Sequence, residues 1–273
     1  MVYDVIIIGS GLGGLVCAHI LSRAGMRVLV LERGKQVGGC MQSYKRHGLT
    51  FDTGLHYIGG LGEGQSLHTI FNHLGLLKLP WQQMDKHFDH ITIEGKSYAF
   101  VQGYEPFVET LIQDFPAARK GLQAYVNLLK QYEAIQFDML NPLIKEQSFY
   151  SDLFETGAWS YLTTTIQDPS LIQVLSGTCL KMELQKETLP MFTFAHGNSS
   201  FIESSWRLQG DSSLIVNSLV NDLISAGGTI VCDAEVIELI EEKGRIQVAR
   251  CSNGETFEGK LFISNTHPLI TCR

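Results

Sequence analysis

The chain begins with a buried-strand pattern that runs directly into a cluster of glycines. Residues 4–8 (DVIII) are mostly β-branched and lead into Gly9, and apolar side chains then recur at helical spacing from Leu12 to Ala24. Gly25 follows, where a left-handed cap would end the helix, and residues 27–31 (RVLVL) have the pattern of a second strand. A strand, a helix and a second apolar strand in succession predict an α/β protein built on a parallel sheet.

The glycines of the first turn have the spacing GxGxxG. Glycine suits the tight turn at Gly9, lets a diphosphate approach the backbone at Gly11, and lets helix and strand pack closely at Gly14. The start of the helix adds free N–H groups and the positive end of its dipole. We therefore predict a dinucleotide-binding loop that comprises Gly9, Ser10, Gly11, Leu12, Gly13 and Gly14.

An acidic residue and a second glycine pair follow this loop. Glu32 ends the second strand, 18 residues after Gly14, where a carboxylate can accept hydrogen bonds from an adenosine ribose. Arg33 leaves contact with a 2′-phosphate open as an alternative. The pair Gly38-Gly39 would let backbone pass close to the ribityl and diphosphate part of a flavin dinucleotide. A plain glycine loop with a surface glutamate is the disfavoured interpretation, because the strand–helix–strand context is complete.

Two segments carry a family resemblance. LERGKQVGG at 31–39 resembles the glutathione-reductase-like flavoproteins. FDTGLHYIGG at 51–60 looks like the phytoene desaturase, carotenoid isomerase and retinol saturase-like (all-trans-retinol 13,14-reductase-like) oxidoreductases. The resemblance covers residues 3–76 strongly and 194–268 in outline. It implies a Rossmann-like FAD-binding domain with an antiparallel β-meander and an inserted mixed α+β substrate domain.

The resemblance also implies positions for individual residues. Gly54 would lie against the flavin ring, and the backbone of Val236 would pair with adenine, although Val236 fits an ordinary strand residue equally well. His56 and Tyr57 are the candidate catalytic proton donors, with Asp52 and Cys40 nearby. A histidine in a glycine-rich loop is more often a structural hydrogen-bonding residue, and Cys40 is more simply a small residue beside the cofactor.

The domain boundaries follow from a second α/β pattern after Gly210. A helix with apolar residues from Leu214 to Ile224 ends at Gly227-Gly228. The strands expected beyond it are 229–231, a meander of 235–240, 245–251 and 255–258, and a separate strand at 261–263. We expect 1–80 and 203–273 to form the FAD-binding domain and 81–202 to form the substrate-domain insert.

The implied activity is FAD-dependent oxidation or reduction of C=C or C–C bonds in an isoprenoid, carotenoid or retinoid-like lipid, by saturation, desaturation or isomerisation. One alternative is an amine-oxidase-like flavoprotein that acts on a small polar amine. Another is a folded but catalytically silent fragment. Family members close the flavin site with a C-terminal strand and helix, whereas this sequence ends at Arg273, so we expect a C-terminally truncated chain.

Composition limits the partners. The net charge is −7 and no stretch concentrates Lys and Arg, so nucleic acid is not expected. Six cysteines without CxxC spacing favour reduced thiols in the cytoplasm, and no metal site is expected. No apolar run reaches the roughly 18 residues of a transmembrane helix, which leaves peripheral membrane contact open. The expected partners are an apolar small-molecule substrate and NAD(P)H or another electron partner.

Overall fold

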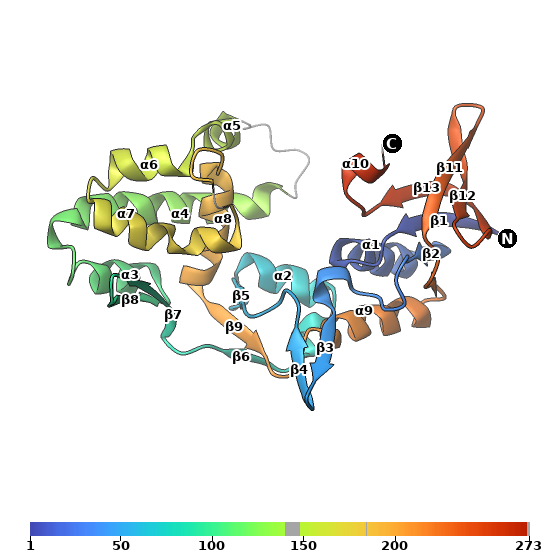
Figure 1. Cartoon of the computed structure of the whole chain (residues 1–273), viewed down its shortest axis with the longest axis horizontal. Coiled ribbons are helices and arrows are strands. Elements are labelled where there is room, and N and C mark those ends of the chain that lie inside the picture. Colours follow the sequence, from blue (N-terminus) through green and yellow to red (C-terminus); the bar gives the residue numbers. More distant parts are fainter. Residues whose placement is uncertain (140–147, 184, 272–273) are drawn as a thin grey trace. The chain divides into compact units, whose positions relative to one another are not determined.

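The chain folds into two compact units. The computed structural model describes residues 1–139, 148–183 and 185–271, with side chains placed outside 134–150 (Figure 1). The first unit comprises Met1–His56, Phe71–Pro80 and Leu208–Arg273, and the second comprises Tyr57–Ile70 and Trp81–Arg207. The assignment of these units to cofactor and substrate is taken up below as a proposal.

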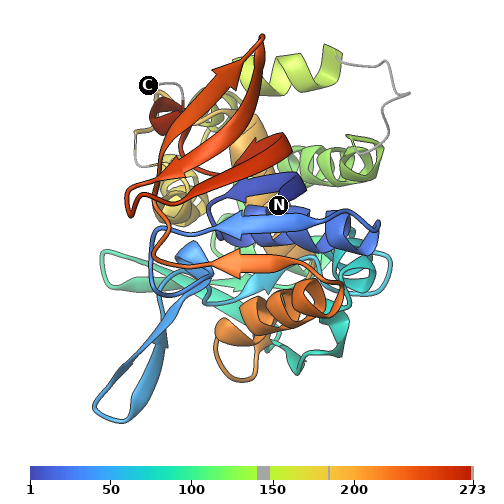
Figure 2. The ribbon, with the colours of Figure 1, turned by 90° about the vertical axis from the view of Figure 1, so that its right-hand side faces the viewer.

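A six-stranded sheet organises the first unit. Its strand order is β10 (Thr229–Val231), β2 (Val28–Leu31), β1 (Val2–Ile8), β13 (Thr256–Ser264), β12 (Arg245–Cys251) and β11 (Val236–Glu242). Strands β10, β2, β1 and β13 are parallel and lie side by side in that order (Figure 2), whereas β11, β12 and β13 form an antiparallel meander. The predicted α/β fold with a parallel sheet and a meander is confirmed.

The last strand differs from the sequence-based prediction. Residues 255–258 and 261–263 were expected to be separate strands, but Thr256–Ser264 is one continuous strand. Its first part pairs with β12, with Phe257 opposite Ala249, and its second part pairs with β1, with Ile263 opposite Ile7. A β-carbon at Gly259 would lie 2.8 Å from the side chain of Ile6. Gly259 therefore marks a close approach to β1 rather than a break.

The alternating side chains of β1 and β2 build a core on each face of the sheet. Val5 and Ile7 pack with Ala18 of α1 (Leu12–Arg23) and Leu223 of α9 (Ser213–Ser225). Ile6, on the opposite face, packs with Ala249 and Cys251 of the meander and with Ala234, which lies just before it. This arrangement places helices on one side of the parallel strands and the meander on the other.

A hairpin in the first unit was not predicted. Strands β3 (Ser43–Arg46) and β4 (Leu49–Asp52) pair antiparallel, and His47 and Gly48 both have positive φ at the turn. Strand β3 was concealed in the sequence because Ser43, Lys45 and Arg46 are not strong β formers. The unit also contains the 3₁₀ turns η1 (Gly39–Met41) and η2 (Leu76–Lys78) and the short helix α10 (Pro268–Thr271). Helix α2 (Ser66–His73) joins residues of both units.

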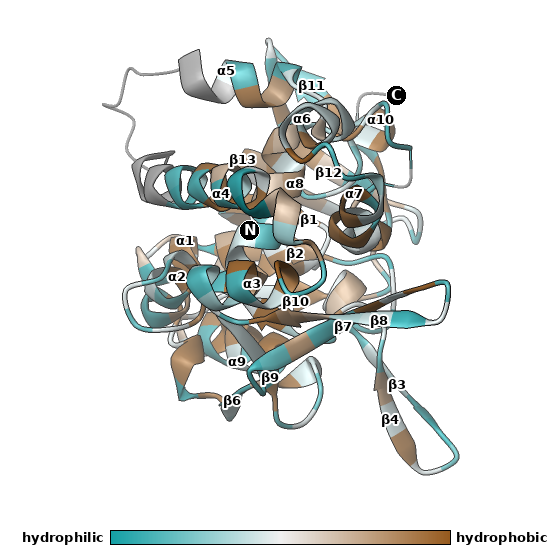
Figure 3. Ribbon diagram, turned by 90° about the vertical axis from the view of Figure 1, so that its left-hand side faces the viewer, coloured by the Kyte–Doolittle hydropathy of each residue, from teal (hydrophilic) through white to brown (hydrophobic). Residues whose placement is uncertain are grey.

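The second unit is mainly helical. Its helices are α3 (Tyr104–Leu111), α4 (Arg119–Met139), α5 (Ser148–Glu155), α6 (Ala158–Thr165), α7 (Pro169–Ser176) and α8 (Met191–Glu203), with 3₁₀ turns η3 (Pro116–Ala118) and η4 (Gly177–Lys181). Helix α8, which was not predicted, contacts α4, α5 and α6. Asp168 caps α7 by accepting from the N–H groups of Ser170 and Leu171. The largely apolar α7, brown in Figure 3, contributes Leu171 and Leu175 to the core.

Short strands complete the second unit. Strands β7 (His87–Ile93) and β8 (Lys96–Val101) form a hairpin, and its turn at Glu94-Gly95 has positive φ at both residues. A second sheet has the order β5 (Ile58–Gly59), β9 (Ser205–Leu208) and β6 (Trp81–Gln83). No helix in the described part of the chain combines the length and apolar character that crossing a bilayer requires.

Candidate dinucleotide-binding site

Two positions of the first glycine loop, Gly9 and Gly14, do not accommodate a side chain. Gly9 has a φ of +93° and donates its N–H to Leu31 O at 2.8 Å, which turns the chain at the end of β1. A β-carbon at Gly14 would lie 2.2 Å from the carbonyl oxygen of Gly9, closer than any real contact. Helix α1 can therefore start directly against the turn only because residue 14 is glycine.

The glycine loop at 9–14 and the pair Gly38-Gly39 lie next to each other. The Gly38 N–H donates to Ser10 O at 3.0 Å, and Gly38 forms an isolated parallel bridge with Gly11. A β-carbon at Gly39 would lie 3.0 Å from Gly11 Cα. The predicted loop at 9–14 and the predicted pair at 38–39 thus form one cradle, which lies at the C-terminal ends of β1 and β2.

Glu32 is fixed at the edge of this cradle. Its Oε2 accepts hydrogen bonds from the Ser10 N–H at 2.9 Å and from the Ser10 hydroxyl, and its Oε1 accepts from the Gly34 N–H at 2.8 Å. Burial opposes ionisation, but the hydrogen bonds from Ser10 and Gly34 and the charge of Arg33 outweigh it, so the pKa of Glu32 is lowered. The result is an oriented carboxylate, with Ser10 fully buried beneath it and Arg33 exposed.

Gly54 packs against the segment that follows the second glycine pair. A β-carbon at Gly54 would lie 2.8 Å from the carbonyl oxygen of Cys40. The hydroxyl of the neighbouring Thr53 donates to Cys40 O at 2.9 Å and to Gln42 O at 2.8 Å. These bonds anchor residues 53–54 beside η1.

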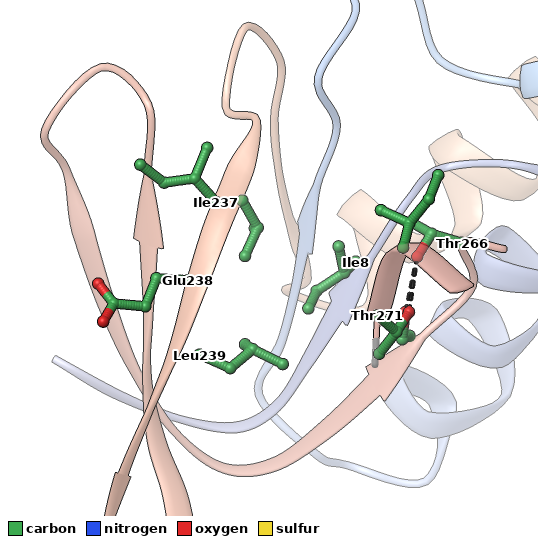
Figure 4. A pocket seen from close by; sticks show the side chains of 9 residues that line it. Ile8, Ile237, Glu238, Leu239, Thr266 and Thr271 are labelled. Carbon is green, nitrogen blue, oxygen red and sulfur yellow. Dashed lines mark hydrogen bonds between the residues drawn. The ribbon is translucent and has the colours of Figure 1, made fainter. Parts of the chain in front are cut away.

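Val236 begins β11, the edge strand of the six-stranded sheet. It lines a pocket of about 300 Å³ together with residues of β1, β11, β13 and α10 (Figure 4). Its pairing with Cys251 leaves the other side of the strand without a neighbour in the sheet. The lining residues are Ile8, Val236, Ile237, Glu238, Leu239, Ser264, Thr266, Ile270 and Thr271.

Asn265 borders the glycine loop and was missed by the sequence analysis. It directly follows β13, and its carboxamide nitrogen lies 3.1 Å from the position of a β-carbon at Gly11. A polar residue immediately after an apolar parallel strand is a signal that could have identified it, because ligands bind at the C-terminal ends of such strands.

The two candidate catalytic residues have different surroundings. The Tyr57 hydroxyl donates to Asp89 Oδ2 at 2.8 Å and contacts Lys181 Nζ, which also pairs with Asp89 at 3.0 Å. Burial, the hydrogen bond to Asp89 and its charge raise the pKa of Tyr57. The phenol therefore stays protonated at ordinary pH. The side chain of His56 is exposed.

The described residues contain neither a metal-binding cluster nor a disulfide. No group of three or more His, Cys, Asp or Glu side chains that could hold an ion occurs there. The five cysteines in that part of the chain are all free thiols (Cys17, Cys40, Cys179, Cys232 and Cys251). Cys272 lies outside the described residues.

The cradle and its acidic edge fit a dinucleotide. A β-carbon at Gly14 would overlap the backbone of Gly9, and a β-carbon at Gly11 or Gly13 would fill the space beside the loop, next to Asn265. The first turn of α1 offers N–H groups that have no acceptor within the helix. Fold and site together define a Rossmann-type dinucleotide-binding protein of the α/β class. In agreement, the family described as an NAD(P)-binding Rossmann-like domain matches residues 7–74.

Two proteins of similar sequence indicate which group of dinucleotide-binding proteins the chain resembles. Human all-trans-retinol 13,14-reductase is 39% identical over 131 residues, which cover 46% of this chain and 22% of that protein. Prolycopene isomerase 1 from an Oncidium hybrid cultivar is 26% identical over 288 residues, which cover 96% of this chain and 48% of that protein. The predicted resemblance is confirmed: the chain is a relative of the retinol saturase and carotenoid isomerase enzymes. It spans less than half the length of these relatives.

Solved structures share the fold. A protein from Pyrococcus furiosus superposes with a TM-score of 0.70 at 22% identity, covering 98% of this chain and 60% of that one. Putrescine oxidase bound to putrescine superposes with a TM-score of 0.63 at 16% identity, covering 96% and 58% respectively. At these identities the likeness concerns the fold alone, so the amine-oxidase alternative is not favoured over the lipid alternative.

Proposed function

We propose that this chain carries the FAD-binding part of an oxidoreductase that acts on C=C or C–C bonds of an isoprenoid, carotenoid or retinoid-like lipid. The proposal rests on the single cradle that the glycine loop at 9–14 and the pair Gly38-Gly39 form, with Glu32 held at its edge. The chain that contains this cradle is similar to retinol 13,14-reductase and prolycopene isomerase. Bound FAD supplies hydride transfer, while the protein binds, orients and excludes water.

The residues of the first unit have separate roles in this proposal. The N–H groups of Gly11, Leu12 and Gly13 bind the diphosphate, and Glu32 accepts hydrogen bonds from the adenosine ribose. Val236 offers its backbone N–H and C=O to adenine, as an edge strand can. Gly54 would face the flavin ring with its backbone, since the direction of a β-carbon there is occupied by the carbonyl oxygen of Cys40. Arg33 is exposed beside Glu32 and can reach an outer phosphate.

The second unit is proposed to bind the lipid. We assign residues 81–202 to the substrate domain because the family resemblance implies it, and the aromatic and aliphatic residues of the unit pack as its core. NAD(P)H or another electron partner completes the proposed reaction. The proposed location is the cytoplasm, with peripheral contact to the membrane from which the lipid is taken.

His56 is the stronger proton-donor candidate, because Tyr57 already contacts Asp89 and Lys181.

The cofactor assignment is tested by FAD titration of the wild-type chain and of Gly11→Ala. Gly11 has ordinary backbone angles (φ −62°, ψ 173°), so alanine causes no backbone strain there, but its β-carbon, 3.1 Å from Asn265 Nδ2, intrudes on the diphosphate. Gly157→Ala is the matched control, because Gly157 also precedes a helix with ordinary angles (φ −70°, ψ 135°) and its β-carbon would meet nothing closer than 4.0 Å.

The expected result is a yellow wild-type protein and a yellow Gly157→Ala variant, with flavin lost from Gly11→Ala. A colourless wild type that takes up no FAD, or a Gly11→Ala variant that retains it fully, contradicts the cofactor assignment. Hydrogen peroxide formed from putrescine, without reduction of an added polyene, contradicts the lipid assignment and favours an amine oxidase.

A further inference from the structure

Asn265 is anchored at the point where the glycine loop begins. Its backbone N–H donates to Ile8 O at 2.8 Å, which extends the parallel pairing of β1 and β13 by one residue beyond Ser264. The position of its Cα is therefore set by the sheet and not by the loop that follows. The side chain leaves from the C-terminal ends of β1 and β13, the edge at which ligands bind in sheets of this kind.

The carboxamide lies alongside three glycines of the fingerprint. Its Nδ2 lies 3.1 Å from the position of a β-carbon at Gly11 and 3.2 Å from that at Gly14, and its Oδ1 lies 2.8 Å from that at Gly13. Gly11 is the position at which the backbone must stay open for an anion to approach the start of α1. Asn265 is thus the side chain that borders the cradle from β13.

The donors of this carboxamide have no protein partner. Asn265 is exposed, and among the described residues its side chain makes no hydrogen bond, in contrast to the neighbouring hydroxyls. Ser264, Thr266 and Thr271 bond one another at 2.7–2.9 Å and are therefore engaged. A role in holding the loop together would require bonds from Asn265 to the loop, and none is present.

We propose that the Asn265 carboxamide binds the diphosphate of the cofactor and completes, from β13, the donor set that α1 begins. The inference rests on the proposed FAD function and adds a binding residue to it. A diphosphate offers only acceptor oxygens. The two N–H donors of the Asn265 carboxamide lie beside Gly11, Gly13 and Gly14, so both their chemistry and their position suit this ligand.

The test compares Asn265→Asp and Asn265→Ala with the wild type, with FAD, ADP and adenosine as ligands. Asn265→Asp keeps the shape but replaces the donor by an anion, while Asn265→Ala removes the whole carboxamide without adding charge. Asn127→Asp is the matched control, because Asn127 is an exposed residue of α4 whose Oδ1 accepts from Gln123, so the same charge is added away from the cradle.

We expect Asn265→Ala to weaken FAD and ADP about tenfold and Asn265→Asp to weaken both about 100-fold, since a hydrogen bond to a charged group is lost and then replaced by repulsion. Adenosine, which has no phosphate, should bind all variants alike, and Tm should not change. Isothermal titration measures FAD and ADP, and ligand-observed NMR measures adenosine.

Three outcomes overturn the inference. FAD affinity of Asn265→Asp equal to that of Asn127→Asp overturns it while leaving the FAD assignment intact. Adenosine weakened as much as ADP overturns it as well, because the change then disturbs the site as a whole. A wild type that binds no FAD overturns the proposed function, and the inference with it.

Discussion

Ser10 and Glu32, 22 residues apart in the chain, are joined by two hydrogen bonds to the same carboxylate oxygen. The backbone N–H of Ser10 donates at 2.9 Å and its hydroxyl donates to the same Oε2. Ser10 is completely buried, so it cannot itself reach a ligand through its side chain. Its position within the fingerprint is better explained by orientation of Glu32 than by direct cofactor contact.

This relationship predicts an order of effects on FAD affinity. Glu32→Gln should weaken FAD binding by about tenfold or more, because a charged acceptor for the ribose hydroxyls is lost. Ser10→Ala should weaken it less, because the backbone bonds from Ser10 and Gly34 still hold the carboxylate. In a Glu32→Gln background, Ser10→Ala should have little further effect. Additive losses in the double variant would show that Ser10 acts independently of Glu32.

Two adjacent helical glycines should respond oppositely to alanine. Gly14→Ala places a β-carbon 2.2 Å from the backbone oxygen of Gly9, so it should destabilise the fold by about 1–3 kcal/mol or more, despite the better helix propensity of alanine. At Gly13 the nearest atom is Oδ1 of Asn265, the end of an exposed side chain that can rotate away. Gly13→Ala should therefore be neutral or stabilising. Thermal melts of both variants measure this difference, and equal losses would contradict the packing argument.

A carboxyl pair in the second unit predicts a decline of stability with rising pH. Burial, a hydrogen bond to Glu133 and the charge of Glu133 raise the pKa of Glu203 to about 9, and Tyr104 holds Glu133 by donating to its Oε2 at 2.7 Å. The folded state therefore keeps a proton on Glu203 that the unfolded chain releases near the ordinary glutamate pKa of 4.5. The resulting stability is complete below that value and is lost as the pH rises toward 9.

Denaturation of wild type and Glu203→Gln at pH 6 and pH 9 tests this. Glutamine mimics the protonated acid, so the variant should lose less stability over this range than the wild type. A loss of about 1 kcal/mol corresponds to roughly 2–4 °C in Tm for a chain of this size. The control is Glu155→Gln, an exposed residue of α5 that should leave the pH dependence unchanged. If the stability of Glu203→Gln and of wild type falls by the same amount between the two pH values, the proton on Glu203 is refuted.

The parts of the fold that the sequence predicted are those governed by local patterns. The run DVIII, the GxGxxG loop and the caps at Gly25 and Gly227 each carry their own signal, and β1, α1, β2 and α9 appear where expected. The single strand β13 was divided in the prediction, because Gly259-Lys260 interrupts the apolar pattern. Only the pairing of β13 with both β12 and β1 explains why a glycine belongs there.

The site was predictable to the same extent. The glycines and Glu32 are recognisable because their spacing along the chain is fixed by one strand–helix–strand unit. Asn265 and the Ser10–Glu32 bonds depend on tertiary pairing, since Asn265 reaches Gly11 only through the register of β13 on β1. The partners of Tyr57, namely Asp89 and Lys181, were equally invisible, because they come from β7 and η4. The roles of His56 and Tyr57 stay predictions.

His19 predicts a loss of stability toward acid pH. It is 1% exposed on α1, and neither ring nitrogen has a hydrogen-bond partner among the residues that the structure describes, although Nδ1 lies 3.8 Å from Asp222 Oδ2. Burial lowers the pKa of His19, and the cations Arg23, His73 and Lys78 add to this while Asp222 opposes it. The folded state therefore holds His19 neutral, whereas the unfolded chain protonates it near pH 6.5. The stability is present above that pH and is lost as the pH falls, by at most about 1.4 kcal/mol per unit.

Replacing His19 by methionine should remove this acid sensitivity and the burial of two unsatisfied nitrogens. We expect His19→Met to raise the free energy of unfolding by about 1–3 kcal/mol at pH 7.5, and by more at pH 5.5. The exposed His90→Met is the control and should stay within about 0.5 kcal/mol of wild type at both values. Urea denaturation at the two pH values decides the matter. Equal or lower stability of His19→Met at pH 5.5 would mean that the imidazole is satisfied in the folded protein, through a protonated pair with Asp222.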